Sequence, residues 1–159
     1  MDEREQPVDT RVKDVLRTKG TLVNSDVLTA DPSTSVHRCV DRMVARNVGS
    51  IVVIENDHIA GIFTERDYLR NVALKDRTPE ETEVQEIMTE DVATVDADTR
   101  LDVCLDRMTD LQCRHLPVVD EVGRLTDIIS MRDCMTQISE AAKSEAVELR
   151  NYVTGQYPR

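Results

Sequence analysis

The sequence predicts an α+β fold made of two copies of one β-α-β-β-α unit, packed sheet against sheet and flanked by terminal helices. Three observations predict it: an internal repeat, apolar residues at helical spacing within each copy, and short β-branched runs typical of strands. The chain of 159 residues can bury one substantial core. One copy of roughly 60 residues would be marginally stable alone, so we expect both copies to form one body.

The repeat is clearest in TADPSTSVHRCVDRM (residues 29–43) and TVDADTRLDVCLDRM (residues 94–108), which are identical at seven of fifteen positions. Further along, GIFTERD (residues 61–67) corresponds to DIISMRD (residues 127–133). Both of these segments contain a small or turn residue, two apolar residues, a hydroxyl, two variable residues and an aspartate. Corresponding residues are 65 positions apart in the first pair of segments and 66 apart in the second, because the second copy has one added residue in the turn around Glu121. The chain therefore contains an internal duplication.

Each copy predicts the same elements in the same order. The first is a short strand, at residues 27–29 and 92–95, followed by a polar turn and an amphipathic helix. Next come two strands joined by a polar turn; the second strand ends at GIFTERD or DIISMRD, where a second helix begins. After Asp133 the helical pattern continues to about Tyr152, which predicts one long helix.

The segments outside the two copies carry signals of their own. The spacing of Val12, Val15 and Leu16 predicts an N-terminal helix that ends at Gly20. Between the copies, TPEE (residues 78–81) predicts a short helix with a capping box. We therefore divide the chain into an N-terminal helical segment (1–20), a first unit (21–76), a linker (77–88), a second unit (89–140) and a C-terminal helix and tail (141–159).

Composition argues against several classes of protein. The formal net charge is −11, which disfavours a nucleic-acid partner because binders of the phosphate backbone gather basic residues on one face. Sixteen arginines against four lysines fit either salt adaptation or codon usage. No apolar run approaches the ~20 residues that cross a bilayer, and the polar N-terminus is unlike a signal peptide. We expect a cytoplasmic protein with no membrane partner.

No catalytic or metal-binding motif stands out. The four cysteines form no CxxC pair, and Cys39 and Cys104 fall in apolar helical patterns typical of buried, reduced thiols. The three histidines lack partners at a spacing that suggests a metal site or a triad. The chain has no Walker, Rossmann or nucleophile-elbow motif. We therefore expect no catalysis.

The repeated motif favours a ligand site. Thr64 and Ser130 each end a strand at a helix N-terminus, where free backbone N–H groups attract anions. Asp67 and Asp133 follow about one turn later, and a carboxylate can accept hydrogen bonds from the vicinal hydroxyls of a ribose. With the apolar residues before them, these groups suit a nucleoside phosphate. The alternative is that the hydroxyls are N-caps and the aspartates favour the helix dipole, which explains the hydroxyls better than the aspartates.

These segments resemble the CBS domain, named after cystathionine β-synthase, in its tandem form, the Bateman module. The resemblance rests on NVGSIVVIENDHIAGIFTERD, CRHLPVVDEVGRLTDIISMRD and the linking EIMTED, and it covers roughly residues 20–140. The ending ELRNYVTGQYP also resembles the tail of small stand-alone members. The resemblance implies two units related by a pseudo-twofold axis, with two clefts between them that bind adenosine nucleotides.

The resemblance also implies which residues line each cleft. Cleft one would join Ile62, Thr64, Asp67, Val92, Ala93, Arg114, His115 and Pro117. Cleft two would join Val27, Leu28, Val48, Gly49, Ser50, Ile128, Ser130 and Asp133. Arg114 and His115 suit a phosphate in cleft one, unless Arg114 pairs with surface acids or His115 only packs. In cleft two, Asp127 replaces the glycine usual in the motif and can either repel a phosphate or crowd the turn, so we expect cleft one to be the one that binds a charged nucleotide.

The function implied by the resemblance is regulatory. The module would sense AMP, ADP or ATP, with NAD(H) or S-adenosylmethionine as further ligands, and would use no catalytic cofactor. It would form a homodimer and act on an effector protein in trans, with Leu69, Val72, Met135 and Ile138 on the helices that meet, unless these four residues belong to the core. The alternative is a ligand-independent dimeric scaffold whose working surface is the terminal helices, including Ile138, Ala142, Val147 and Leu149.

Overall fold

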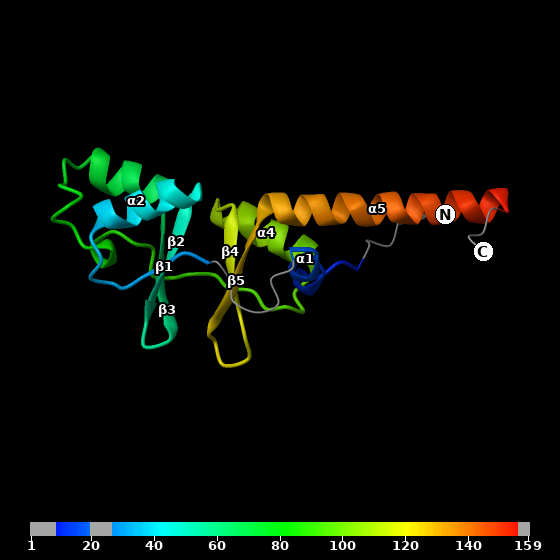
Figure 1. Ribbon diagram of the computed structural model, residues 1–159, viewed down its shortest axis with the longest axis horizontal. Coiled ribbons are helices and arrows are strands. Elements are labelled where there is room, and N and C mark those ends of the chain that lie inside the picture. The colour runs from blue at the N-terminus through cyan, green and yellow to red at the C-terminus, as the bar shows by residue number, and fades with distance from the viewer. Residues whose placement is uncertain (1–8, 20–26, 156–159) are drawn as a thin grey trace.

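The structure is a computed structural model that describes residues 9–19 and 27–155. Its helices and strands form two small units placed side by side, and a long C-terminal helix runs out from the second unit (Figure 1). The predicted α+β class is therefore confirmed. Residues 1–8 and Gly20, which the sequence assigned to the N-terminal helix, lie outside the described residues.

The first unit contains β1 (Thr29–Ala30), α2 (Val36–Arg46), β2 (Ser50–Glu55), β3 (His58–Thr64) and α3 (Glu65–Tyr68), which continues as a π-helical turn over Leu69–Ala73. β1 pairs in parallel with β2, and β2 pairs antiparallel with β3. The Ser35 side chain accepts the Arg38 N–H at 3.2 Å and so caps α2. At its other end α2 stops at Asn47, which has a left-handed backbone conformation.

The second unit contains α4 (Leu101–Leu111), β4 (His115–Val119), β5 (Leu125–Ser130) and α5 (Met131–Thr154), and β4 pairs antiparallel with β5. The long helix predicted after Asp133 is confirmed by α5. The strand predicted at residues 92–95 was too long, because only Val95 forms a bridge, parallel to Val118. The chain turns immediately afterwards, where the Thr99 N–H donates to the Asp96 carbonyl at 3.2 Å.

The short helix predicted at residues 78–81 is wrong. The chain makes a turn there, with the Glu81 N–H donating to the Thr78 carbonyl at 3.1 Å, and a 3₁₀ turn follows at Val84–Glu86. The reason is pairing with the first unit just beyond the turn. The Thr82 carbonyl accepts the Val36 N–H at 2.8 Å, so its backbone is not available to a continuing helix.

Each unit is completed by the segment that precedes the other unit. The helix α1 (Val12–Lys19) precedes the first unit in sequence but packs on the second unit. The Val12 N–H donates to the Thr99 carbonyl and the Leu101 N–H donates to the Thr10 carbonyl, both at 2.9 Å. The linker does the same for the first unit, where the Val84 N–H donates to the Thr34 carbonyl at 2.8 Å. The two segments are themselves similar, TRVKDVL (residues 10–16) and TEVQEIM (residues 82–88). The duplication therefore extends to residues 10–16 and 82–88, which we call the leaders. The leaders are crossed, because each one precedes one unit in sequence and packs on the other.

Each unit has its own apolar core. The first is built around Phe63, Ile51 and Val53 and includes Val84 and Ile87 from the linker. The second has the following buried residues: Val12, Val15, Val95, Leu101, Cys104, Met108, Leu116, Val118, Ile129 and Cys134. The leaders thus contribute apolar side chains as well as backbone hydrogen bonds, which ties the two units into one body.

The four positions expected at a dimer interface divide between core and surface. Val72 belongs to the first core and is 1% exposed, and Ile138 packs against the second core. Leu69 and Met135 are 58% and 60% exposed. Of these four positions, only Leu69 and Met135 are therefore exposed enough to contact a second subunit.

The cysteines behave as small apolar residues, as predicted for Cys39 and Cys104. Both are fully buried, and so is Cys134. Burial raises the pKa of the Cys39 thiol to about 11, so this thiol is protonated at neutral pH. Within the described ranges, no helix is long and apolar enough to span a membrane, and no three His, Cys, Asp or Glu side chains are grouped to hold a metal ion.

Gly61→Ala is expected to destabilise the protein by about 1–3 kcal/mol, the usual cost of overpacking. A Cβ at Gly61 would lie 2.5 Å from the Met88 sulfur and 2.9 Å from the Thr89 carbonyl oxygen. The methionine can move, but the Thr89 backbone is fixed because its N–H and carbonyl are both bonded to Ile62, at 2.9 and 3.0 Å. Urea unfolding measures the change.

Gly49→Ala is the matched control, because a Cβ there would make ordinary contact with the Glu65 carboxyl carbon at 3.5 Å. We expect it to change the free energy of unfolding by less than about 0.5 kcal/mol. Equal stability of the two variants would mean that the linker does not pack on β3 in solution.

Candidate functional site

Both copies of the repeated motif form a reciprocal capping box. In the first, the Asp67 N–H donates to Thr64 Oγ1 at 3.3 Å and the Thr64 N–H donates to Asp67 Oδ2 at 2.9 Å. In the second, the Asp133 N–H donates to Ser130 Oγ and the Ser130 N–H donates to Asp133 Oδ2, both at 3.0 Å. The N-cap alternative is therefore confirmed for the hydroxyls. Our view that capping explains the aspartates poorly was wrong, because the third helical position is where a capping-box carboxylate lies.

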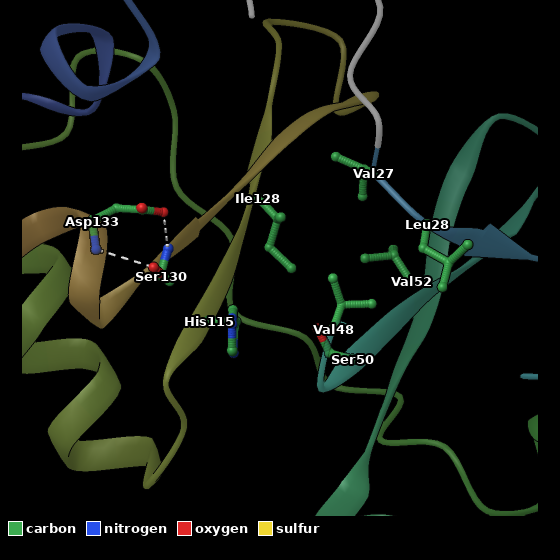
Figure 2. Close-up of a pocket in the computed structure, with 9 residues that line it drawn as sticks. All are labelled: Val27, Leu28, Val48, Ser50, Val52, His115, Ile128, Ser130 and Asp133. Atoms are coloured by element: carbon green, nitrogen blue, oxygen red, sulfur yellow. Dashed lines mark hydrogen bonds between the residues drawn. The ribbon is translucent and has the colours of Figure 1, made fainter. Parts of the chain in front are cut away.

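A cavity of about 260 Å³ lies between the two units, and the second motif lines it (Figure 2). One wall comes from the first unit and is mainly apolar, and the other comes from the second unit and is mainly polar. The lining residues are Val27, Leu28, Val48, Ser50 and Val52 on the first side and His115, Ile128, Ser130 and Asp133 on the second. Seven of the eight residues predicted for cleft two are thus brought together.

The alternation of side chains along the strands places these groups in the cavity. On β2, Ile51 and Val53 belong to the first core, so Ser50 and Val52 face the other way, toward the second unit. On β5, Ile129 belongs to the second core, whereas Ile128 and Ser130 face the cavity. The inner faces of the two sheets therefore meet at the cavity.

Gly49 is the member of predicted cleft two that does not line the cavity. Its carbonyl accepts the Glu65 N–H at 3.1 Å, so its backbone helps to begin α3. Val52 is the cavity residue that sequence reasoning missed. Its position two residues after Ser50 on the same strand was the available signal, because side chains two apart share a face.

His115 was assigned to cleft one, but it lines the cavity formed by the cleft-two residues. The reason is its register, because His115 lies directly opposite Ser130 in the β4–β5 ladder. Opposite residues in an antiparallel pair project from the same face, so the two side chains enter the same space. Figure 2 shows His115 beside the Ser130–Asp133 capping box.

The other residues predicted for cleft one have local backbone and packing roles, and none of them lines this cavity. Ile62 pairs through its backbone with Thr89, and Asp67 Oδ1 accepts the Thr89 hydroxyl at 3.5 Å. In the second unit, Ala93 packs against the core, the Arg114 carbonyl accepts the Met131 N–H at 2.8 Å and the Pro117 carbonyl accepts the Val95 N–H at 3.0 Å. Val92 is half-buried.

Asp127 has a different role from its counterpart in the first copy, Gly61. The Ile62 N–H next to Gly61 donates to the Thr89 carbonyl, whereas the Ile128 N–H donates to Asp127 Oδ1 at 2.6 Å. Asp127 is 7% exposed, and its Oδ2 has no hydrogen-bond partner among the described residues. A buried carboxylate therefore lies next to the Ile128 wall of the cavity.

Comparison with known families matches the CBS domain model twice, over residues 12–74 and 84–140. The chain belongs to the CBS domain family. The matched ranges begin at the two leaders that cross between the units, and they include both capping-box motifs. The tandem CBS arrangement indicated by the resemblance is thus confirmed.

Two relatives resemble the chain over most of its length. The mitochondrial CBS domain-containing protein CBSX3 of Arabidopsis thaliana is 33% identical over 153 residues, covering 93% of this chain and 74% of the relative. A solved CBS-domain containing protein from Agrobacterium tumefaciens is 33% identical, with a TM-score of 0.72, covering 80% of this chain and 98% of that one.

A third structure shares the fold at lower identity. The CBS domain pair of protein MJ0100 was solved in complex with 5′-methylthioadenosine and S-adenosyl-L-methionine. It is 23% identical with a TM-score of 0.67, and it covers 80% of this chain and 98% of that one. At this identity the likeness establishes the fold alone.

Proposed function

We propose that this CBS pair is a regulatory module that binds an adenosine-type ligand in the cavity between its units and acts on a partner in trans. The observation that carries the proposal is the cavity itself, which has an apolar wall from the first unit and a wall from the second unit that includes the Ser130–Asp133 capping box. No catalytic step is part of the proposal.

The lining suits a nucleoside. Val27, Val52 and Ile128 offer apolar surface to a flat base, and the Ser130 hydroxyl and Asp133 carboxylate offer acceptors to ribose hydroxyls. The volume of about 260 Å³ lies just below the range of about 300–1,000 Å³ typical of drug-sized ligands. The adenosine compounds bound by the MJ0100 pair support the same class of ligand.

Ligand contact with both units gives a route to regulation. One wall of the cavity belongs to the first unit and the other to the second, so a bound ligand stabilises the arrangement that brings both walls to it. The resulting change in population is limited by the difference in affinity for the two arrangements. In this proposal, a homodimer and an effector protein in trans read this change.

The test is a thermal-shift titration with adenosine, AMP, ADP, ATP, NADH and S-adenosylmethionine. We expect a saturable rise in Tm with at least one ligand, reaching about 2.7 kcal/mol of added stability at one hundred times Kd. Asp133→Ala should abolish the rise, because its carboxylate lines the cavity.

Asp67→Ala is the matched control, since it removes the same capping box from the first copy and leaves the cavity lining intact. Either substitution costs about 0.5–2 kcal/mol of capping energy, so the ligand-dependent increment is compared rather than the basal Tm. Loss of the increment in Asp67→Ala alone would move the site to cleft one. No increment with any ligand would favour the scaffold function.

One observation favours the scaffold as the second candidate. The outer half of α5 extends beyond both units (Figure 1). Its exposed apolar residues are Val147, Leu149, Tyr152 and Val153. Exposed apolar surface of this kind is typical of a helix that meets a protein partner. Light scattering with and without ligand would show whether assembly is independent of nucleotide.

A further inference from the structure

Resting on the function proposed above, we infer that the cavity takes an uncharged or cationic adenosine derivative in preference to a phosphorylated one. The first observation is the charge of its lining. No lysine or arginine lines the cavity in the described part of the chain, and Asp133 is its one acidic side chain. Ser50, Ser130 and His115 are the remaining polar groups.

A phosphate bound there would lack the groups that normally compensate it. Phosphates in proteins are held by charge-assisted hydrogen bonds from arginine or lysine, or by helix N-termini with free N–H groups. At the start of α5, the Asp133 N–H is already bonded to Ser130 Oγ, and the Met131 N–H donates to the Arg114 carbonyl. The helix terminus therefore has fewer N–H groups to offer an anion.

Asp127 adds a second carboxylate near the cavity, on the face of β5 opposite to the one that carries Ile128 and Ser130. It is buried, it neighbours Ile128 in the strand, and its Oδ2 has no hydrogen-bond partner among the described residues. Like charges in a partly buried site repel strongly because little water screens them. The Asp133 carboxylate in the lining and the Asp127 carboxylate on the other face of the strand, with no lysine or arginine in the lining, thus disfavour a phosphate and favour a neutral or positive substituent at the 5′ position of the ribose.

The nearby arginines do not neutralise the negative charge at the cavity. Arg66 is engaged elsewhere, with Nη1 donating to the Gln112 carbonyl at 2.7 Å. Arg114 and Arg132 are exposed and do not line the cavity. A formal net charge of −11 for the chain adds a weak, screened repulsion of the same sign.

Isothermal titration with adenosine, 5′-methylthioadenosine, S-adenosylmethionine, AMP and ATP tests the inference. We expect the first three to bind at least about tenfold more tightly than AMP, a difference of about 1.4 kcal/mol, and ATP to bind more weakly than AMP. Because the discrimination is electrostatic, the ratio between adenosine and AMP should fall as salt is added.

Asp127→Asn should reduce the difference in affinity between adenosine and AMP. We expect the affinity for AMP to rise several-fold and the affinity for uncharged adenosine to change less. Its side-chain oxygen can still accept the Ile128 N–H. Asp127→Gly, which places the residue of the first copy at this position, is a second variant in case the amide is poorly accommodated. Asp110→Asn, on the exposed side of α4, is the matched control and should change neither affinity.

The outcomes separate this inference from the function on which it rests. AMP binding as tightly as adenosine, or tighter, would overturn the charge selection and leave the adenosine-binding function standing. An unchanged ratio in both Asp127 variants and at high salt would also overturn it. Absence of binding by every ligand at millimolar concentration would remove the proposed function and the inference together.

Discussion

Val12→Asp is expected to lower the free energy of unfolding by about 5 kcal/mol. Val12 is 0% exposed and belongs to the second core, although it precedes the first unit in sequence. Replacement forfeits about 1.5–3 kcal/mol of apolar burial, and the desolvated carboxylate costs several kcal/mol more. Since small domains have about 5–15 kcal/mol of stability in total, much of the protein should be unfolded in mild denaturant. Urea unfolding followed by circular dichroism measures the loss.

Val44→Asp is the matched control, because Val44 is 74% exposed on α2. We expect this variant to lie within about 0.5 kcal/mol of the parent protein. Equal stability of the two variants would show that α1 does not pack on the second unit in solution, and the crossed arrangement of leaders would have to be abandoned.

The crossed leaders matter for function because they connect the units around the cavity. α1 is packed on the second unit, and the first residues of the described chain after it, Val27 and Leu28, already line the cavity from the first unit. A ligand that bound both walls would therefore act on two units, each of which is completed by the leader that precedes the other. Under the function proposed above, a movement of either unit would disturb the core of the other unit through the leader attached to it.

The order of elements could be predicted because its signals are local. Helical spacing, short β-branched runs and turn residues lie within a few positions of one another, and the duplication showed each signal twice. The helix expected at residues 78–81 failed for a non-local reason. Its capping residues are present, but backbone pairing between Thr82 and Val36 takes the chain in an extended direction. Tertiary hydrogen bonds thus outweighed the local preference.

The residues of the candidate site could be singled out from the sequence, but their arrangement in space could be predicted only in part. The motif hydroxyls and aspartates were identified because they recur, and their capping geometry follows from their spacing. The assignment of His115 failed because cleft membership depends on which face of a strand a side chain occupies. Its pairing with Ser130 decides that face, and register cannot be derived from motif order alone.

Phe63→Ala is expected to destabilise the protein by about 3–5 kcal/mol, the usual cost of truncating a buried aromatic side chain. Phe63 is the only phenylalanine in the chain, it is 0% exposed, and it lies opposite Ile51 at the centre of the first core. Because the interior is close-packed, the surrounding side chains have little freedom to fill the space that the ring leaves. Leu74→Ala, at a position that is 80% exposed, is the control and should change stability by less than about 0.5 kcal/mol.

The shape of the unfolding curve in Phe63→Ala tests whether the two units fold as one body. Phe63 belongs to the first core and Val12 to the second, but each core contains a leader that precedes the other unit. Loss of the first core should therefore release Val84 and Ile87 and weaken the second unit through the linker. We expect a single cooperative transition, displaced to lower urea. Two separate transitions, with the second core unaffected, would show that the shared leaders do not couple the units.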